Sequence, residues 1–365
     1  MPAEYSSRTE TIPAVSVVMS VFNGERFLPE AVESILDQRF KDFEFIIVDD
    51  GSTDRSPSIL DFYQNSDSRV RVFHEEHAGL VSSLNRGFAL ARGKYLGRMD
   101  ADDVASVDRL ALQVDFMEVH EETGVLGGTV EWIDANGKSL GIYPYPFEDA
   151  DIKAELLRRC AMWHPTILLR REVFTWAGGY RNVVGAEDYD LWLRVASKFQ
   201  LANLETVILK YRIHPQQVSM RLRMKQVLGT IAAQVAAKRR MEGLPDPLDN
   251  VSESTPEALV AWGVPLSKQR SEFVSECRRW SRLMCMAGEY ATALKNAQEV
   301  LNCCVEGVER WQIADLHVTV AQLLWREGRA LSSAAALGRA LLTRPLVTGH
   351  LLKCLLKDTL NNSPA

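Results

Sequence analysis

The sequence contains no apolar run that approaches the roughly 20 residues a membrane-spanning helix needs, which excludes an ordinary transmembrane segment. Residues 1–11 are polar and lack the basic and apolar regions of a secretory signal peptide. We therefore expect a cytoplasmic protein, with attachment to the inner face of the membrane left open.

The chain also has few cysteines and little excess charge. Its six cysteines lack the paired short spacings of a zinc site. We expect most of them to be small buried side chains in a protein that works in a reducing compartment. The formal net charge of −6 argues against a sequence-independent nucleic-acid binder, whose affinity comes mainly from Lys and Arg neutralising phosphates. The cysteines are Cys160, Cys277, Cys285, Cys303, Cys304 and Cys354.

A glycine-rich phosphate loop is missing as well. The segment after the first predicted strand, Ser20-Val21-Phe22-Asn23-Gly24-Glu25-Arg26, matches neither the dinucleotide fingerprint nor the P-loop. If a diphosphate binds here, something other than backbone amides must balance its charge. A bound metal ion would do so.

What the sequence does contain is a regular alternation of strand and helix patterns. A length of 365 residues predicts about two domains. In the first 100 residues, apolar runs of strand length alternate with amphipathic helical segments. This rhythm predicts a doubly wound, mostly parallel sheet that binds ligands outside the carboxyl ends of its strands. The expected strands span residues 15–21, 43–48 and 70–73, and a fourth ends at Asp100.

Two of these strands end in clustered acids. Asp49 and Asp50 follow the second strand, and Asp100, Asp102 and Asp103 follow the fourth. Clustered carboxylates repel one another, and a hard cation such as Mg²⁺ or Mn²⁺ would neutralise them through oxygen ligands. A solvated acidic turn that caps the helix starting near Asp108 is the alternative. Asp103 either orients the other two acids or faces solvent.

The pattern changes after a helix that ends near His120. Residues 125–133 and 138–143 flank Asn136-Gly137, a strong hairpin signal, and predict an antiparallel addition on one edge of the sheet. Two further glycines, Gly178 and Gly179, permit close approach or positive φ. Acids then open an amphipathic helix near residue 187, and a last strand over 207–212 precedes His214.

The carboxyl-terminal third shows helical patterns, interrupted by a turn-rich linker over residues 243–250. We expect a flexible tail over residues 1–13, an α/β domain over 14–220 and an α-helical region over 221–365. Helical patterns before and after Gly288 and Gly328 resemble two tetratricopeptide units. Stable arrays of such units generally need three or more, so we expect these helices to pack either on the catalytic domain or on a protein partner. Residues 341–356 either pack into a core or lie on a membrane surface.

Together these motifs resemble a family-two glycosyltransferase of the GT-A fold, a Rossmann-like fold for nucleotide-diphospho-sugar transferases. The resemblance covers about residues 14–220. Its motifs, in the family's order, are Val17-Val18-Met19-Ser20-Val21-Phe22-Asn23, Ile47-Val48-Asp49-Asp50-Gly51-Ser52-Thr53-Asp54, Asn85-Arg86-Gly87, Asp100-Ala101-Asp102-Asp103, Gly178-Gly179-Tyr180 and Glu187-Asp188-Tyr189.

The resemblance implies a nucleotide site and a metal site. Asp50 and Ser20 would contact the donor's nucleotide, and the alternatives are a turn cap for Asp50 and a filled strand end for Ser20. Asp100 would meet both ribose and metal, and Asp102 would hold the metal. The cofactor implied is Mn²⁺ or Mg²⁺. His214 occupies a position where members of the family can supply a third metal ligand or a contact to the diphosphate. A satisfied structural histidine is the alternative.

Catalysis would fall to the acids near residue 187. Asp188 resembles the base that takes a proton from the acceptor hydroxyl, with Glu187 as its rival, and such an attack inverts the anomeric configuration. Capping of the helix is the alternative for both acids.

Four residues are weaker candidates for the sugar or acceptor pocket: Trp163, His164, Gly178 and Gly179. For Trp163 and His164, packing under the Gly178 loop is an equally good interpretation. Arg98 either meets a phosphate or pairs with an acid.

The resemblance implies transfer from a UDP- or dTDP-linked sugar to a glycan or lipid-linked acceptor, in polysaccharide or glycoconjugate biosynthesis. A catalytically idle sugar-nucleotide domain that serves the helical region as a docking platform is the alternative from another class.

Overall fold

The computed structural model describes residues 12–217, 222–250, 254–303 and 305–344. The chain forms two compact units. The first comprises the residues up to Trp132, Gly141–Asn182 and Glu187–Arg212. The second comprises Ile133–Leu140, Val183–Ala186 and the residues from Ile213 onward. The domain boundary expected at residue 220 stays a prediction.

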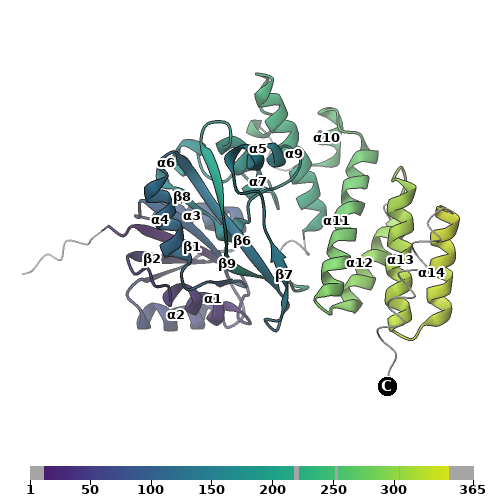
Figure 1. The fold of residues 1–365 in the computed structure, drawn as a ribbon, viewed down its shortest axis with the longest axis horizontal. Helices are drawn as coiled ribbons and strands as arrows, with labels where there is room; N and C mark the ends of the chain where they lie inside the picture. The colour runs from purple at the N-terminus through teal and green to yellow at the C-terminus, as the bar shows by residue number, and fades with distance from the viewer. Residues whose placement is uncertain (1–11, 218–221, 251–253, 304, 345–365) are drawn as a thin grey trace, which may run out of the picture. The chain divides into compact units, whose positions relative to one another are not determined.

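The first unit is built on one mixed sheet (Figure 1). In the described part of the chain its order is β3-β2-β1-β4-β8-β6-β9-β5, with β7 paired to β6. This arrangement confirms the predicted α/β fold class. The strands are β1 (Val15–Val21), β2 (Phe43–Asp49), β3 (Val70–His74), β4 (Tyr95–Asp100), β5 (Val104–Ala105), β6 (Thr123–Ile133), β7 (Ser139–Tyr143), β8 (Leu168–Arg170) and β9 (Gln200–Arg212).

The parallel part of the sheet brings the acidic strand ends together. β1 pairs in parallel with both β2 and β4, and β2 pairs in parallel with β3. The register sets Val21 opposite Asp49 and Ser20 opposite Asp100. Since these strands end level with one another, the loops that follow β1, β2 and β4 share one edge of the sheet, as the sequence predicts.

The antiparallel part is more extensive than a hairpin on an edge. β8 pairs with β4 and with β6, and β5 pairs with β9, each antiparallel. The expected hairpin of β6 and β7 is present, with Gly137 at φ +83° in its turn. The prediction that this hairpin lies on one edge of the sheet was wrong for β6, which lies inside the sheet between β8 and β9. β7 pairs with β6 outside the main strand order.

The helices of the first unit are α1 (Leu28–Leu36), α2 (Ser56–Ser66), α3 (Leu80–Leu90), α4 (Arg109–Val119), α5 (Asp149–Leu156), α6 (Arg171–Ala177) and α7 (Glu187–Val195), with a 3₁₀ turn, η1 (His164–Thr166). Sequence patterns missed α6 and β5. Each is too short to establish a period, and α6 ends at Gly178, which has φ +68°.

Gly87 lets α3 lie close against the sheet. A Cβ added there would stand 2.4 Å from Cγ1 of Val18, a fully buried side chain of β1. No rotamer of a short β-branched side chain relieves such a contact, so the helix or the strand would have to move. The glycine of the Asn85-Arg86-Gly87 motif is therefore required by packing.

We expect Gly87→Ala to destabilise the protein by about 1–3 kcal/mol, the usual cost of overpacking a core. Gly338→Ala is the matched control, because a Cβ at that helical glycine meets no atom within 4 Å. There the better helix propensity of alanine should leave stability unchanged or raised. Thermal unfolding followed by circular dichroism measures both variants. Equal melting temperatures would contradict the packing argument.

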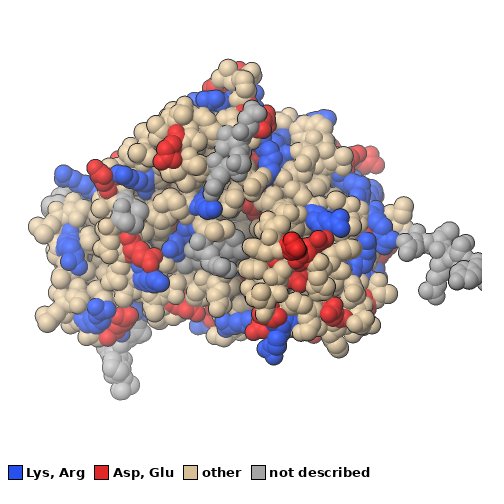
Figure 2. All heavy atoms as spheres, turned by 180° about the vertical axis from the view of Figure 1, so that it is seen from behind, with Lys and Arg blue, Asp and Glu red and all other residues tan. Residues whose placement is uncertain are grey.

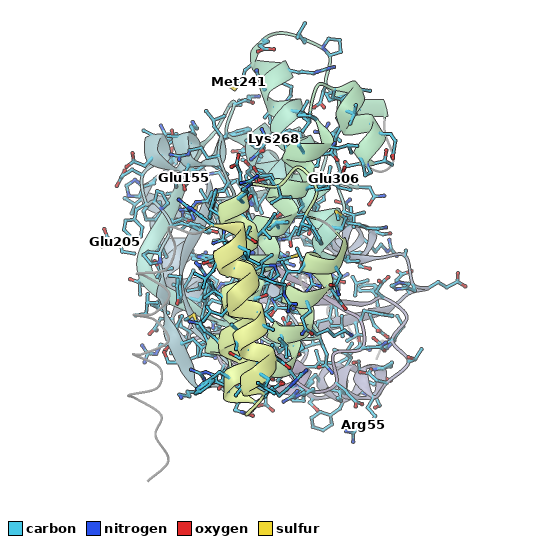
Figure 3. All side chains as sticks on the ribbon, turned by 90° about the vertical axis from the view of Figure 1, so that its right-hand side faces the viewer. Arg55, Glu155, Glu205, Met241, Lys268 and Glu306 are labelled. Carbon is cyan, nitrogen blue, oxygen red and sulfur yellow. The ribbon has the colours of Figure 1, made fainter. Side chains whose placement is uncertain are left out.

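The second unit consists mainly of helices. They are α9 (Arg223–Met241), η2 (Pro247–Asn250), α10 (Pro256–Ala261), α11 (Leu266–Met286), α12 (Tyr290–Cys303), α13 (Arg310–Arg326) and α14 (Ala330–Thr343). The expected glycine turns are present, with φ +81° at Gly288 and +73° at Gly328. α13 and α14 pack side by side (Figure 1), and α14, coloured yellow, faces the viewer in Figure 3. The predicted amphipathic segment 341–356 runs beyond the described residues from position 345.

Charges of both signs lie on the face of the molecule that Figure 2 shows. On the face seen in Figure 2, Lys and Arg are interspersed with Asp and Glu. Exposed ion pairs such as Lys94–Glu118 at 2.7 Å contribute only about 0–1 kcal/mol each. Among the described residues, none of the helices has the length and hydropathy to cross a bilayer.

Candidate active site

The loops after β1 and β2 are joined by hydrogen bonds between side chains and backbone. Asn23 Oδ1 accepts from the Thr53 N–H at 2.8 Å, and the Asn23 N–H donates to Ser52 Oγ at 2.9 Å. Asn23 is held at φ +52°, a left-handed conformation that asparagine tolerates. Ser56 Oγ accepts in the same way from Gly24. These motif residues build a fixed rim at the edge of the sheet.

Asp50 is buried and holds the loop before α3. Its carboxylate accepts from the backbone N–H groups of Ala78 and Gly79, and Oδ2 lies 2.9 Å from Nδ1 of His77. The His77 ring stacks on Phe22, with 4.3 Å between centroids, and both rings are partly exposed. Sequence reasoning missed this aromatic pair beside Asp50, because β1 and residue 77 are far apart in the chain.

Asp100, Asp102 and Asp103 converge after β4. One carboxylate oxygen from each lies within 4.8 Å of the others. Asp103 is only 1% exposed, so the alternative that it faces solvent was wrong. Its Oδ1 accepts from the Arg212 N–H at 2.8 Å, and Arg212 Nε donates to the carbonyl of Asp102 at 2.8 Å. The last residue of β9 therefore fixes the turn, a role that the sequence did not reveal.

The electrostatics of this cluster favour a bound cation. Burial, together with the neighbouring Asp102 and Asp100 carboxylates, raises the pKa of Asp103 well above its ordinary value. Burial also raises the pKa of Asp100. Asp103 Oδ2 is buried and has no hydrogen-bond partner within the described part of the chain. A divalent cation would relieve both the repulsion and the unpaired oxygen.

Arg98 is a buried cation beneath the acids. Its side chain is 4% exposed, and Nη2 lies 2.5 Å from Asp100 Oδ1. Nε and Nη1 have no hydrogen-bond partner among the described residues. Of the two interpretations from sequence, pairing with an acid is confirmed. The guanidinium also acts electrostatically on Glu187 and Asp188, which links the two groups of carboxylates.

Glu187 and Asp188 begin α7 and lie side by side in a buried environment. Burial and the neighbouring Asp188 carboxylate raise the pKa of Glu187 to about 7. Burial raises the pKa of Asp188 to about 6. The Asp188 side chain is 20% exposed and that of Glu187 is 7% exposed. Asp188 is therefore the better placed of the two to meet a substrate.

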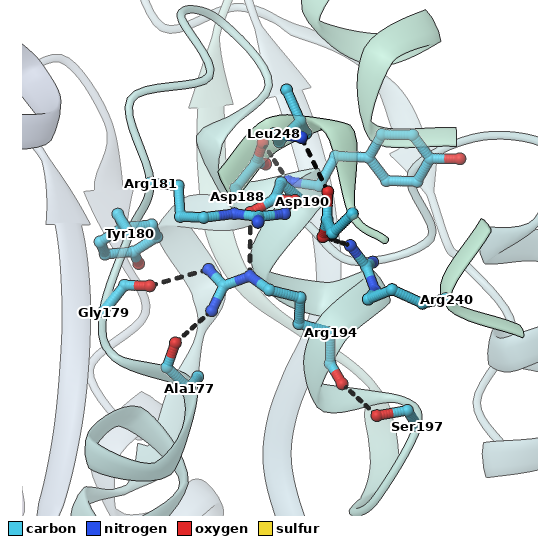
Figure 4. A network of polar contacts seen from close by, with 12 residues as sticks. Ala177, Gly179, Tyr180, Arg181, Asp188, Asp190, Arg194, Ser197, Arg240 and Leu248 are labelled. Atoms are coloured by element: carbon cyan, nitrogen blue, oxygen red, sulfur yellow. Dashed lines mark hydrogen bonds and ion pairs between the residues drawn. The ribbon is translucent and has the colours of Figure 1, made fainter. Parts of the chain in front are cut away.

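Two arginines hold the start of α7 against the Gly178-Gly179 loop (Figure 4). Asp190, which is fully buried, pairs with Arg181 and with Arg194 Nε at 2.9 Å. Arg194 also donates to the carbonyls of Ala177 and Gly179. Asp190 lies two residues after Asp188, so these contacts fix the first turn of α7 relative to the Gly178-Gly179 loop.

The same loop is held from α3 by Asn85. Its Nδ2 donates to the carbonyl of Tyr180 at 2.9 Å, and its Oδ1 accepts from the Tyr180 N–H at 3.0 Å. Gly179 has φ +77°, and a Cβ there would lie 2.8 Å from Asn85 Oδ1. The glycines predicted for the sugar pocket thus have a structural reason of their own, and their contact with a ligand stays a prediction.

The side chains of His164 and Trp163 have different surroundings in the structure. His164 is buried in η1, with Nδ1 3.8 Å from Asp188 Oδ2 and 3.9 Å from Glu187 Oε1. Trp163 stacks on Tyr145 with 4.7 Å between centroids, and its Nε1–H donates to the carbonyl of Tyr143. Trp163 therefore belongs to a neighbouring aromatic cluster, whose role with sugars stays a prediction.

His214 belongs to the second compact unit and is buried. Its backbone N–H donates to Gln217 Oε1 at 2.9 Å. Its role as a metal or diphosphate ligand stays a prediction.

A mixed sheet of this order, with acids grouped at the carboxyl ends of its parallel strands, is the arrangement of the GT-A fold. Residues 16–175 match the profile of glycosyl transferase family 2. The chain is 32% identical over 206 residues to the O-antigen biosynthesis glycosyltransferase WbnJ of Escherichia coli, over 55% of this chain and 80% of WbnJ. It belongs to glycosyltransferase family 2, with additional carboxyl-terminal helices, and is a glycosyltransferase.

Two solved structures share the fold at low sequence identity. Residues 1–349 of Staphylococcus aureus TarS, in complex with UDP-GlcNAc, align with a TM-score of 0.51 and 15% identity, covering 89% of this chain and 90% of TarS 1–349. The mannosyltransferase PcManGT of Pyrobaculum calidifontis, in complex with GDP-Man and Mn²⁺, aligns with a TM-score of 0.50 and 18% identity, covering 91% of this chain and 87% of PcManGT.

Proposed function

We propose that this glycosyltransferase moves a sugar from a nucleoside diphosphate to a hydroxyl acceptor, with a divalent cation bound at the Asp100 cluster and Asp188 as the base. The observation that carries the proposal is that two separate groups of acids, the one after β4 and the one at the start of α7, both interact with one buried guanidinium, that of Arg98. Both groups have the geometry to hold a cation, and we assign the cation to the three acids after β4 and the proton to the acids of α7. The similarity to WbnJ, an O-antigen biosynthesis glycosyltransferase, favours a polysaccharide or glycoconjugate product.

Asp100, Asp102 and Asp103 would hold the cation. They offer only carboxylate oxygens, which are the ligands that Mg²⁺ and Mn²⁺ prefer. When bound, such a cation stabilises the charge that develops on a departing diphosphate. The Mn²⁺ complex of PcManGT supports this choice of metal.

Asp188 would accept the acceptor's proton. The acceptor oxygen forms a bond to the anomeric carbon as the bond from that carbon to the diphosphate oxygen breaks, and the hydroxyl proton passes to Asp188. The base is Asp188, whereas the cation that stabilises the leaving diphosphate is held by other carboxylates. We therefore propose that the acceptor attacks from the face of the sugar opposite the diphosphate, which inverts the anomeric configuration.

The nucleotide would lie over the rim of the sheet near Asp50. Phe22 and His77 form a partly exposed aromatic pair there, which offers a surface on which a base could stack. We propose a UDP- or dTDP-linked donor. TarS is known with UDP-GlcNAc and PcManGT with GDP-Man, so a test of donors must span several bases.

A donor screen followed by a transfer assay tests the proposal. UDP-, dTDP- and GDP-linked sugars are each added with Mn²⁺, and the expected donor raises the melting temperature, because a ligand of the native state stabilises it. The same donor should then lose its sugar to an acceptor glycan with release of nucleoside diphosphate. Binding without any turnover would favour the idle scaffold.

We also propose that the reaction takes place in the cytoplasm. Cys160, Cys277 and Cys285 are free thiols, which suits a reducing compartment.

Activity should fall at low pH. Asp188 acts as a base only when ionised, and its pKa is raised to about 6, next to Glu187 at about 7. We therefore expect kcat/KM to be lost as pH falls through the range 7 to 6, by about tenfold for each further pH unit. Initial rates at saturating Mn²⁺ give the profile. A plateau extending to pH 5 would contradict the assignment of the base.

A further inference from the structure

Asn85, Tyr180 and His164, which come from separate elements, form a chain of contacts that ends at the acids of α7. Asn85 holds the backbone of Tyr180 through both atoms of its amide. Tyr180 Oη lies 2.8 Å from His164 Nε2, and both side chains are buried. Nδ1 on the other side of the imidazole faces Asp188 and Glu187. The ring is therefore held between a hydroxyl and two carboxylates.

The imidazole has one favoured tautomer. Burial, with a smaller effect of the Arg98 charge, lowers the pKa of His164 well below its ordinary value, so the ring is neutral and carries one proton. A proton on Nδ1 points its positive end at the ionised Asp188 carboxylate, whereas a lone pair there would be repelled by it. The Tyr180 hydroxyl, whose own pKa is raised by burial, keeps its proton and donates it to Nε2.

We propose that His164 is a positioning residue of the transfer reaction: Tyr180 fixes its tautomer, and its Nδ1–H stabilises the ionised form of the carboxylate that receives the acceptor's proton. The distances of 3.8 and 3.9 Å exceed a direct hydrogen bond, so the contact is electrostatic in this state. The inference rests on the proposed function, because it assigns a purpose to the base proposed there.

Other groups also act on these carboxylates and must be held constant in a test. They come from β4, the segment before η1, η1 and the loop after α6, and they are Arg98, Asp100, Cys160, His164 and Tyr180. Of the changes available, Tyr180→Phe is the smallest, because it removes one hydroxyl and leaves every charge in place.

The first experiment compares Tyr180→Phe with Tyr95→Phe. Tyr95 is the matched control: it is a fully buried tyrosine whose hydroxyl donates to Glu118 at 2.8 Å, at the opposite end of β4 from Asp100. We expect Tyr180→Phe to lower kcat about tenfold, the effect of one hydrogen bond near a charge, and to move the acid limb of the pH profile upward. Donor affinity in Mn²⁺ should stay within about twofold, and Tyr95→Phe should change neither quantity.

The second experiment separates the two ring nitrogens. The amide nitrogen in His164→Asn can occupy the place of Nδ1, and that in His164→Gln can occupy the place of Nε2. We expect His164→Ala and His164→Gln to lose about 100-fold in kcat, and His164→Asn to recover part of that loss. Melting temperatures of all variants identify any that fail to fold.

Two results would overturn the proposal. Equal kcat and pH profiles for Tyr180→Phe and Tyr95→Phe would remove the role of the tyrosine. Loss of Mn²⁺-dependent donor binding in His164→Ala would make His164 a ligand of metal or donor instead. Neither result bears on Asp188→Asn, so failure of this inference is distinct from failure of the proposed function.

Discussion

Replacing Asp102 by alanine should abolish sugar transfer while the protein remains folded. Asp102 is one of three acids whose carboxylate oxygens lie within 4.8 Å of one another, so its loss removes one ligand of the proposed cation. A metal ion supplies several kcal/mol of stabilisation to a departing diphosphate, which corresponds to a loss of about 10³-fold or more in kcat/KM. Donor binding should also lose its dependence on Mn²⁺.

A nearby acid provides the control for this prediction. Asp108 pairs with Arg39 at the surface, and such exposed pairs contribute little to stability. Asp108→Ala should therefore keep wild-type activity and melting temperature. Transfer rates and calorimetric titration of the donor with and without Mn²⁺ measure both variants. Full activity in Asp102→Ala would remove that residue from the metal site.

The second large effect is expected at Asp188. The change Asp188→Asn keeps the size of the side chain and removes its ability to accept a proton, so kcat should fall by about 10²–10⁴-fold, the range for loss of a general base. Because the residue is in the cluster of α7 and not in that of β4, Mn²⁺ and the donor should still bind. Single-turnover rates with saturating donor and acceptor measure the loss.

Glu187→Gln decides between the two neighbouring acids. Glu187 is the more buried of the pair, and burial holds its pKa near 7, so we expect it to influence Asp188 without taking the proton itself. Its replacement should cost about tenfold at most and leave the acid limb in place, because Glu187, with a pKa of about 7, is already mostly protonated at the pH where Asp188 titrates. A larger loss in Glu187→Gln than in Asp188→Asn would exchange the two roles.

The sequence predicts the framework of the site well. Apolar runs that end in acids place Asp49, Asp50 and Asp100 at strand ends, and the register of β1 with β2 and β4 confirms that placement. The reason is general: in a parallel sheet buried on both faces, the strands read as continuous apolar runs whose ends are plain to see. Asn136-Gly137 specifies its hairpin for an equally local reason.

What the sequence could not predict are contacts between distant segments. Asn23 with Ser52, Asn85 with Tyr180, and Arg212 with Asp103 each join residues at least 29 positions apart. No periodicity records such pairs, because each is a single polar side chain that satisfies the backbone or the acid of another loop. The burial of Asp103 and the place of His164 beside the acids of α7 follow from these contacts, and so they emerged only with the fold.

Donor binding by Asp188→Asn in the presence of Mn²⁺ tests the division of labour between the two carboxylate groups most directly. Calorimetric titration of that variant with the donor found by the screen should give wild-type affinity that disappears when Mn²⁺ is chelated, in a protein that no longer transfers sugar. If the variant failed to bind the donor, or bound it and still transferred sugar at the wild-type rate, the separation of metal site from base would be contradicted.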